Sequence, residues 1–129
     1  MLYKKASEMK PTPIPHCMGG EGTVMMERLL DAPAEMLGKG RAYVRHTLAP
    51  GVTIGRHTHE HEMESMVIVS GRAVHIINGE EQILEKGDII AAMPGAWLFI
   101  TRELWNLPKA EFCLAFFLRR RKWKSIFFP

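Results

Sequence analysis

The sequence GVTIGRHTHEHEMESMVIVSG, from Gly51 to Gly71, is the stretch that says most about the fold. Between His57 and Glu64 it places three histidines and three glutamates, directly before the apolar run 65–70. A charged, solvated loop would account for this composition, and so would a metal site. Imidazole nitrogens and carboxylate oxygens are the donors that divalent transition metals take in proteins. Both interpretations are open at this point.

Strand signals surround this stretch. Asn78-Gly79 is a strong hairpin signal, Pro94-Gly95 marks a second turn, and the short apolar segments recur every eight to twelve residues or so. The expected strands are 23–30, 41–48, 65–70, 73–77, 81–85, 89–93 and 110–118. The pattern predicts an all-β protein, an antiparallel sandwich or barrel. The one helix candidate, 32–40, has room for at most two turns before its glycines.

Length and composition predict one domain over residues 1–129. A chain of 129 residues with 47% hydrophobic residues suits a single core. No apolar run approaches the roughly 18 residues of a membrane span, and the N-terminus lacks the apolar core of a secretory signal. Two cysteines are too few for a disulfide framework, which favours a reducing, cytoplasmic location.

The positive charge of the chain is local. Residues 119–124 hold five of the seventeen basic residues, and removing these five from the net charge of +3 leaves −2. The body of the protein therefore does not have the charge of a nucleic-acid binder. We expect residues 1–22 to form a flexible lead-in and 119–129 a mobile basic tail.

Strand geometry allows two arrangements of the histidine–glutamate cluster. Alternate residues share a face, so His57 and His59 project together. If the strand continues, His61 joins them and the glutamates face outward. If the chain turns first, Glu64 points back at His57 and His59 and completes a two-histidine, one-carboxylate triad. Spacing alone leaves both open.

The stretch resembles the first motif of the cupins, G-x5-H-x-H-x4-E-x6-G. Gly51, His57, His59, Glu64 and Gly71 match its five fixed positions. The resemblance extends over about 41–94 and is closest to small single-domain bacterial cupins. It implies a double-stranded β-helix (jelly-roll barrel), usually dimeric.

The resemblance also implies a metal ion inside the barrel. His57, His59 and Glu64 are the expected ligands of one divalent transition metal ion (Mn, Fe, Ni or Zn). The same triad suits several ions, so the sequence does not choose among them. The open positions of the ion would receive a small-molecule ligand.

The second cupin motif, G-x5-P-x-G-x2-H-x3-N, is only partly present. Gly87 and Gly95 occupy its glycine positions, but Met93 replaces the proline. Leu98 stands where the family has a fourth ligand, a histidine, and Arg102 stands at the asparagine. A leucine has no lone pair to donate, so three protein ligands plus water are expected, unless another histidine takes part.

The other histidines each have two interpretations. His75 can fill the vacant position or be a hydrogen-bonded core histidine, and the core role is favoured. His61 is expected in a solvated turn, with lining of the barrel mouth as the alternative. His46 alternates with apolar neighbours and is expected to be a packed or interface residue.

Three large apolar side chains are candidates to line the pocket around the ion. Met66 and Met93 suit an apolar wall, although methionine is also an ordinary core filler. Trp97 follows the Pro94-Gly95 turn and can cover a ligand or bury a sheet edge. Together with His61 and His75, these residues form the predicted pocket lining.

The leading hypothesis is a metal-binding small-molecule cupin; if the protein is an enzyme, we expect it to be metal-dependent and to act on a small oxygen-bearing organic substrate. The alternative is a non-catalytic ligand-binding or sensory module, because the fold hosts many functions. The Trp-, Phe- and Arg-rich segment that begins at Trp97 can also be a part altered relative to the family. Sheet edges favour a homodimer, with 23–30 as a strand for exchange. We expect no nucleic-acid or membrane partner.

Overall fold

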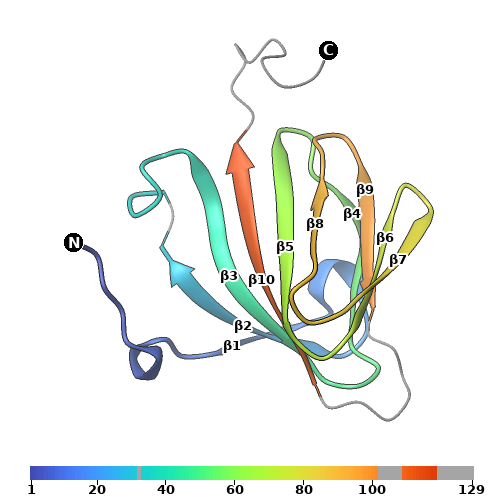
Figure 1. Cartoon of the computed structure of the whole chain (residues 1–129), viewed down its shortest axis with the longest axis horizontal. Helices are drawn as coiled ribbons and strands as arrows, with labels where there is room; N and C mark the ends of the chain where they lie inside the picture. The colour runs from blue at the N-terminus through green and yellow to red at the C-terminus, as the bar shows by residue number, and fades with distance from the viewer. Residues whose placement is uncertain (32, 102–108, 119–129) are drawn as a thin grey trace.

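The chain folds into two antiparallel sheets that face each other across a core (Figure 1). The computed structural model describes residues 1–31, 33–101 and 109–118. The strands are β1 (Thr12–Pro15), β2 (Thr23–Leu30), β3 (Gly40–Leu48), β4 (Thr53–Thr58), β5 (Glu62–Ser70), β6 (Ala73–Ile77), β7 (Glu80–Leu84), β8 (Ile89–Ala92), β9 (Trp97–Thr101) and β10 (Ala110–Leu118). Two short 3₁₀ turns, η1 (Ala6–Glu8) and η2 (Cys17–Gly19), precede β2.

The larger sheet has the strand order β1-β2-β3-β10-β5-β8, and the smaller one β4-β9-β6-β7. Consecutive strands repeatedly cross from one sheet to the other, as in a jelly roll. The expectation of an all-β jelly-roll barrel is therefore confirmed. Among the described residues, no helix is both long and apolar enough to cross a membrane.

Alternation along the strands builds the core. On β5, every second residue from Glu62 to Ile68 is buried, and β3 shows the same period over its nine residues. Phe112, Leu48 and Ile100 are fully buried between the sheets. Because side chains of a strand point alternately to its two faces, one face of each sheet closes the core.

Most of the expected strands are present. β2, β6 and β10 have the predicted bounds, and the Asn78-Gly79 pair closes the β6–β7 hairpin with left-handed φ angles of 50° and 85°. The helix expected over 32–40 is wrong: the described residues 33–38 form turns and Lys39 a bend. Leu37 and Gly38 have left-handed φ angles of 55° and 67°, which an α-helix does not tolerate.

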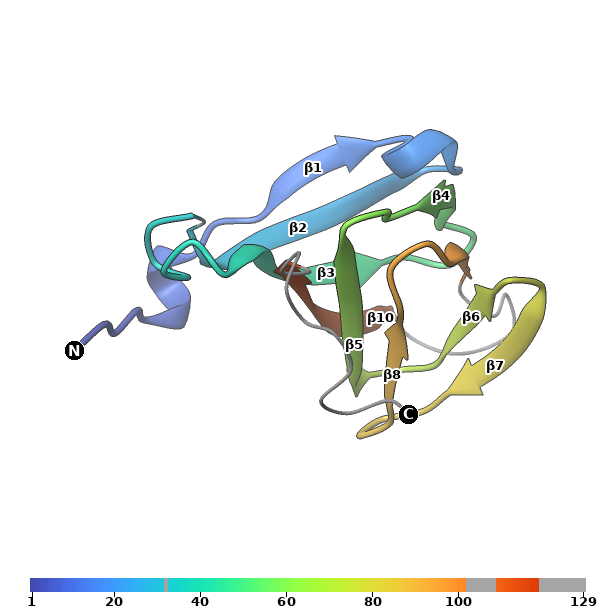
Figure 2. The ribbon, with the colours of Figure 1, turned by 90° about the horizontal axis from the view of Figure 1, so that it is seen from above.

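The N-terminal segment differs from the flexible lead-in expected over 1–22. β1 pairs with β2 in antiparallel register, and η2 lies against β4 (Figure 2). β1 contains prolines but is an edge strand, where a missing N–H leaves no ladder bond unmade. β2, the candidate for exchange, pairs with β1 and β3 of its own chain. The basic tail 119–129 lies outside the described residues.

Candidate metal centre

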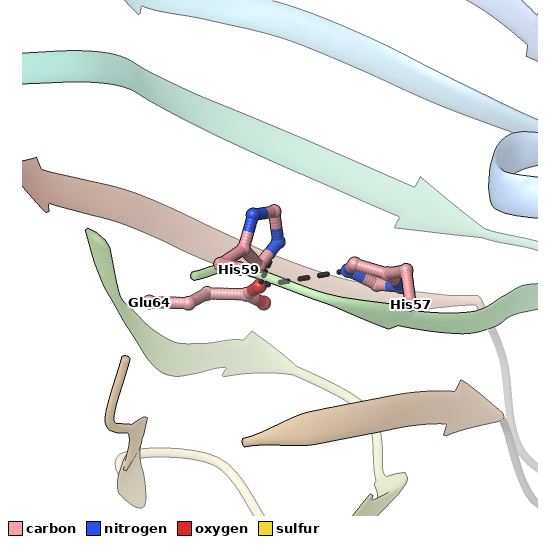
Figure 3. A group of neighbouring side chains, drawn as sticks. All are labelled: His57, His59 and Glu64. Carbon is pink, nitrogen blue, oxygen red and sulfur yellow. Dashed lines mark ion pairs between the residues drawn. The ribbon is translucent and has the colours of Figure 1, made fainter. Parts of the chain in front are cut away.

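The end of β4 and the start of β5 bring three side chains together. His57 lies on β4, His59 follows its last residue, and Glu64 is the third residue of β5. One nitrogen of each imidazole and one carboxylate oxygen all lie within 4.8 Å of one another (Figure 3). The backbone N–H of Gly95 donates to the carbonyl of His59 at 2.9 Å and fixes the bend.

The bend decides between the two arrangements that strand geometry allowed. β4 ends at Thr58, so the unbroken strand that would align His61 with His57 and His59 does not form. His61 is exposed, as expected for a turn residue, whereas Glu64 is only 2% exposed. The structure therefore brings together two histidines and one carboxylate.

The second nitrogen of each histidine is already held. Nδ1 of His57 lies 2.7 Å from the carbonyl oxygen of Gly55, and Nδ1 of His59 lies 2.8 Å from Oε1 of Glu62. Both partners are acceptors, so each Nδ1 carries the proton and donates it. The Nε2 lone pairs then remain for a metal, and they lie 3.8 Å and 3.2 Å from Oε2 of Glu64. Such outer hydrogen bonds orient histidine ligands in metal sites.

Glu62 and Arg41 contact this group, and the sequence did not single them out. Glu62 is 7% exposed, and Nε–H of Arg41 donates to both of its carboxylate oxygens, at N–O distances of 2.8 Å and 2.9 Å. The guanidinium carbon of Arg41 lies 4.3 Å from the centre of the Phe116 ring. An Arg41–Glu62–His59 chain thus fixes one imidazole. The only sequence signal was the period of two that places Glu62 on the same face as Glu64.

Buried atoms without partners support the metal interpretation. Nε2 of His59 and both carboxylate oxygens of Glu64 are buried and make no hydrogen bond within the described part of the chain. Burial opposes ionisation of Glu64, but in the metal-free site protonated His57 and His59 outweigh it and lower the pKa of that carboxyl to about 2. A buried carboxylate without hydrogen bonds is costly. A divalent cation between these three residues would satisfy all the unpaired atoms.

Leu98 lies beside this group. On β9 it is the cross-strand partner of His57, and it is 1% exposed. Directly opposed residues share a face of the sheet, so position 98 projects to the interior next to His57. A leucine there supplies an apolar wall and no donor. Arg102, the second departure from the motif, lies outside the described residues.

A cavity of about 240 Å³ opens from the three residues into the space between the sheets. Its walls come from both sheets, including the edge strand β1, and from η2. The lining residues are Ile14, Cys17, Met18, Met26, Arg28, Arg41, Ala42, Val44, His46, Ile54, His57, His59, Glu64, Ile100, Leu114 and Phe116. Apolar side chains therefore form most of the wall.

None of the five residues that the sequence predicted to line the pocket belongs to the wall of this cavity. His61 and Met93 are exposed, and Met66 packs in the core at 0% exposure. Trp97 stacks under Arg56, whose guanidinium carbon lies 4.1 Å from the ring centre. His75 is 1% exposed, and neither ring nitrogen has a hydrogen-bond partner among the described residues. It is buried as expected but lies outside the group of three.

His46 also lines the cavity, which the sequence did not predict. Alternation on β3 predicted its burial, but not that it faces a cavity. Burial lowers the pKa of His46 to about 4, against a smaller opposing effect of Glu64, so the imidazole is neutral near pH 7. Its ring meets Phe112 edge to face, with centroids 5.7 Å apart.

Comparisons with known proteins agree with this architecture. Residues 44–99 match the model of the Cupin domain family. A Thermotoga maritima relative named oxalate-binding protein is 38% identical over 88 residues, which are 68% of this chain and 72% of the relative. The chain belongs to the cupin family.

Solved structures extend the likeness to nearly the whole chain. A Thermotoga maritima structure described as a predicted oxalate decarboxylase superposes with a TM-score of 0.84 at 32% identity, covering 91% of this chain and 99% of that one. KdgF from a Halomonas species superposes with a TM-score of 0.73 at 16% identity, covering 92% and 96%. The second likeness concerns the fold alone.

Replacing Glu62 with Gln should weaken metal binding about tenfold to a hundredfold. The change replaces the carboxylate that accepts from Nδ1 of His59 and pairs with Arg41 by a neutral amide, so the imidazole is held less firmly in its orientation. Dissociation constants from competition with a chromogenic chelator would measure the effect. Glu60→Gln is the matched control, because Glu60 is exposed two residues away. Affinity within threefold of the wild type in Glu62→Gln would contradict the role of Glu62.

Proposed function

We propose that this cupin binds one divalent transition metal ion through Nε2 of His57, Nε2 of His59 and the carboxylate of Glu64. The ion then holds a small organic ligand through oxygen atoms, and a carboxylate is the class that fits best. The observation that carries the proposal is the set of converging, buried atoms on His59 and Glu64 that make no hydrogen bond among the described residues. A bound ion supplies Lewis acidity and open coordination positions.

The donor set and the comparisons support the same ligand class. Two imidazoles and one carboxylate suit Mn, Fe, Ni or Zn, and Leu98 leaves a position without a protein donor. A relative carries the name oxalate-binding protein, and oxalate is a small carboxylate that chelates metals. Arg28 lines the same cavity and favours an anion, while the charge of Arg41 is paired with Glu62.

Binding without turnover is the simpler form of this function. Apart from the three proposed ligands, the described lining groups with exchangeable protons are Cys17, His46 and the two arginines. Burial raises the pKa of the Cys17 thiol, and the pKa of His46 is about 4. Neither is tuned to exchange protons near neutral pH. A metal-dependent enzyme on an oxygen-bearing substrate is the second candidate, since the ion itself can polarise a bound oxygen.

The assembly and the compartment are part of the proposal. We expect a homodimer, because β1 and β8 leave the edges of the larger sheet open. We expect a cytoplasmic location, which suits the two free cysteines, Cys17 and Cys113. A small-molecule ligand is the expected partner, with neither nucleic acid nor a membrane involved.

Calorimetric titration of the protein with glycolate and with oxalate tests the proposed function. With one equivalent of Mn²⁺ or Zn²⁺ bound, at least one of the two should bind with a stoichiometry of one per chain. The metal-free protein should bind at least tenfold more weakly, because the chelating contacts are lost. Equal binding with and without metal would contradict a ligand held by the ion.

A further inference from the structure

The cavity next to the three proposed ligands is larger than oxalate requires. An engineered protein cavity of about 150 Å³ holds benzene, and this one measures about 240 Å³. The space therefore suits a chelating head together with a body about the size of a six-membered ring. Two carboxylates joined directly, as in oxalate, would leave its apolar part unfilled.

The strand register shows how the cavity is laid out. Glu64 pairs with Phe116 of β10, while His46 pairs with Phe112, four residues further along the same strand. Four residues of extended strand span about 13 Å. The carboxylate of Glu64 and the imidazole of His46 therefore stand toward opposite ends of the cavity.

Apolar side chains line the middle of the cavity. Leu114 and its cross-strand partner Val44 lie between the two ends on the larger sheet. Ile54 and Ile100, which pair on the smaller sheet, line the facing wall. Both pairs are buried, at 3% exposure or less. A polar ligand body would lose its hydration there without replacement, so this part of the cavity selects an apolar one.

The far end carries a polar group without a partner. His46 is 7% exposed, and its Nδ1 is buried and makes no hydrogen bond to the residues that the structure describes. Leaving such an atom unsatisfied is costly, whereas a ligand group that pairs with it is favoured. Because the surroundings are apolar and His46 is neutral near pH 7, an uncharged partner suits it better than an ion.

We propose that the ligand is a 2-hydroxy or 2-oxo monocarboxylate with an apolar, ring-sized body and a neutral hydrogen-bonding group at its far end, which His46 contacts. The inference rests on the proposed function, because the head of the ligand chelates the ion held by His57, His59 and Glu64. His46 is the specificity-determining residue, and the apolar walls set the size of the body.

Three ligands with the same chelating head test the proposal: L-lactate, L-3-phenyllactate and L-3-(4-hydroxyphenyl)lactate, each titrated calorimetrically into the Zn²⁺-loaded protein. Burying the ring should make phenyllactate bind at least tenfold more tightly than lactate. The added hydroxyl should tighten binding by about a further tenfold, through its hydrogen bond with His46. Oxalate serves as the reference chelator without a body.

Two variants of His46 test whether its hydrogen bond causes the tighter binding of the hydroxylated ligand. His46→Leu should abolish the difference between the two phenyl ligands, because leucine cannot form the hydrogen bond. His46→Asn, whose amide reaches the position of Nδ1, should restore at least part of that difference. Melting curves of both variants establish that they fold before their affinities are compared.

The outcomes separate this inference from the proposed function. If no carboxylate binds more tightly with metal than without it, the proposed function fails. If lactate or oxalate binds in a metal-dependent way and phenyllactate binds no more tightly than lactate, the inference alone fails. A hydroxyl preference that survives in His46→Leu overturns the role of His46.

Discussion

Replacing His59 with Ala should remove most of the metal from the purified protein, whereas replacing His61 with Ala should leave the metal content nearly unchanged. His59 contributes Nε2 at 3.2 Å from Glu64, and its loss would leave two donors that cannot fix the geometry of an ion. His61 is exposed in the bend between β4 and β5 and points to solvent. Metal analysis of protein purified without added metal would measure both.

Thermal stability should follow the same order. An ion that binds only the folded state stabilises it by mass action, by about 2.7 kcal/mol at one hundred times its dissociation constant. The melting temperature of His59→Ala should therefore respond much less to added Zn²⁺ than that of His61→Ala. If His61→Ala emptied the site and Glu64→Ala did not, the three-histidine arrangement would be correct instead.

Replacing Gly55 with Ala should lower the melting temperature by roughly 10 °C and reduce metal binding as well. A Cβ at position 55 would meet the backbone carbonyl of Met18, and it would lie 2.9 Å from the backbone nitrogen of Gly20. Overpacking of this kind costs about 1–3 kcal/mol, and backbone atoms can yield less than a side chain can. The carbonyl of Gly55 also holds Nδ1 of His57, so the strain reaches a proposed ligand.

Gly87→Ala provides the matched control for this effect. A Cβ there meets no atom within 4 Å, so only the strain of its φ of +92° is added. That strain costs about 1–2 kcal/mol and lies away from the site. Calorimetric melting and metal titration of both variants would compare them. A Gly55→Ala protein that melts within 2 °C of the wild type, with full metal affinity, would contradict the close packing of η2 on β4.

Local patterns in the sequence predicted much of the fold. The run Ala110–Leu118 is apolar apart from Glu111 and has the length of a strand, and it forms β10 with the predicted bounds. The turn at Asn78-Gly79 requires left-handed backbone angles that these two residues adopt readily, so the β6–β7 hairpin was predictable. The lead-in expected over 1–22 included no strand, but Thr12–Pro15 forms one, because an edge position removes the cost of its two prolines.

The candidate site was likewise predictable from the sequence only in part. His57, His59 and Glu64 lie within eight residues, so spacing and a family motif identified them. The Arg41–Glu62 pair joins residues 21 positions apart, and no local pattern signals which arginine meets which glutamate. The cavity wall likewise combines Met18, Ile54, Ile100 and His46 from distant segments. Pairings of this kind depend on how the two sheets pack, which a periodicity does not encode.

Calorimetric titration of the metal-free wild-type protein with Zn²⁺, in parallel with the Glu64→Gln variant, tests the central claim most directly. The proposed site predicts saturable binding of one ion per chain in the wild type. Glu64→Gln should bind at least a hundredfold more weakly, because a neutral amide replaces the buried carboxylate. No saturable binding by the wild type, or equal affinities of the two proteins, would contradict a metal centre formed by His57, His59 and Glu64.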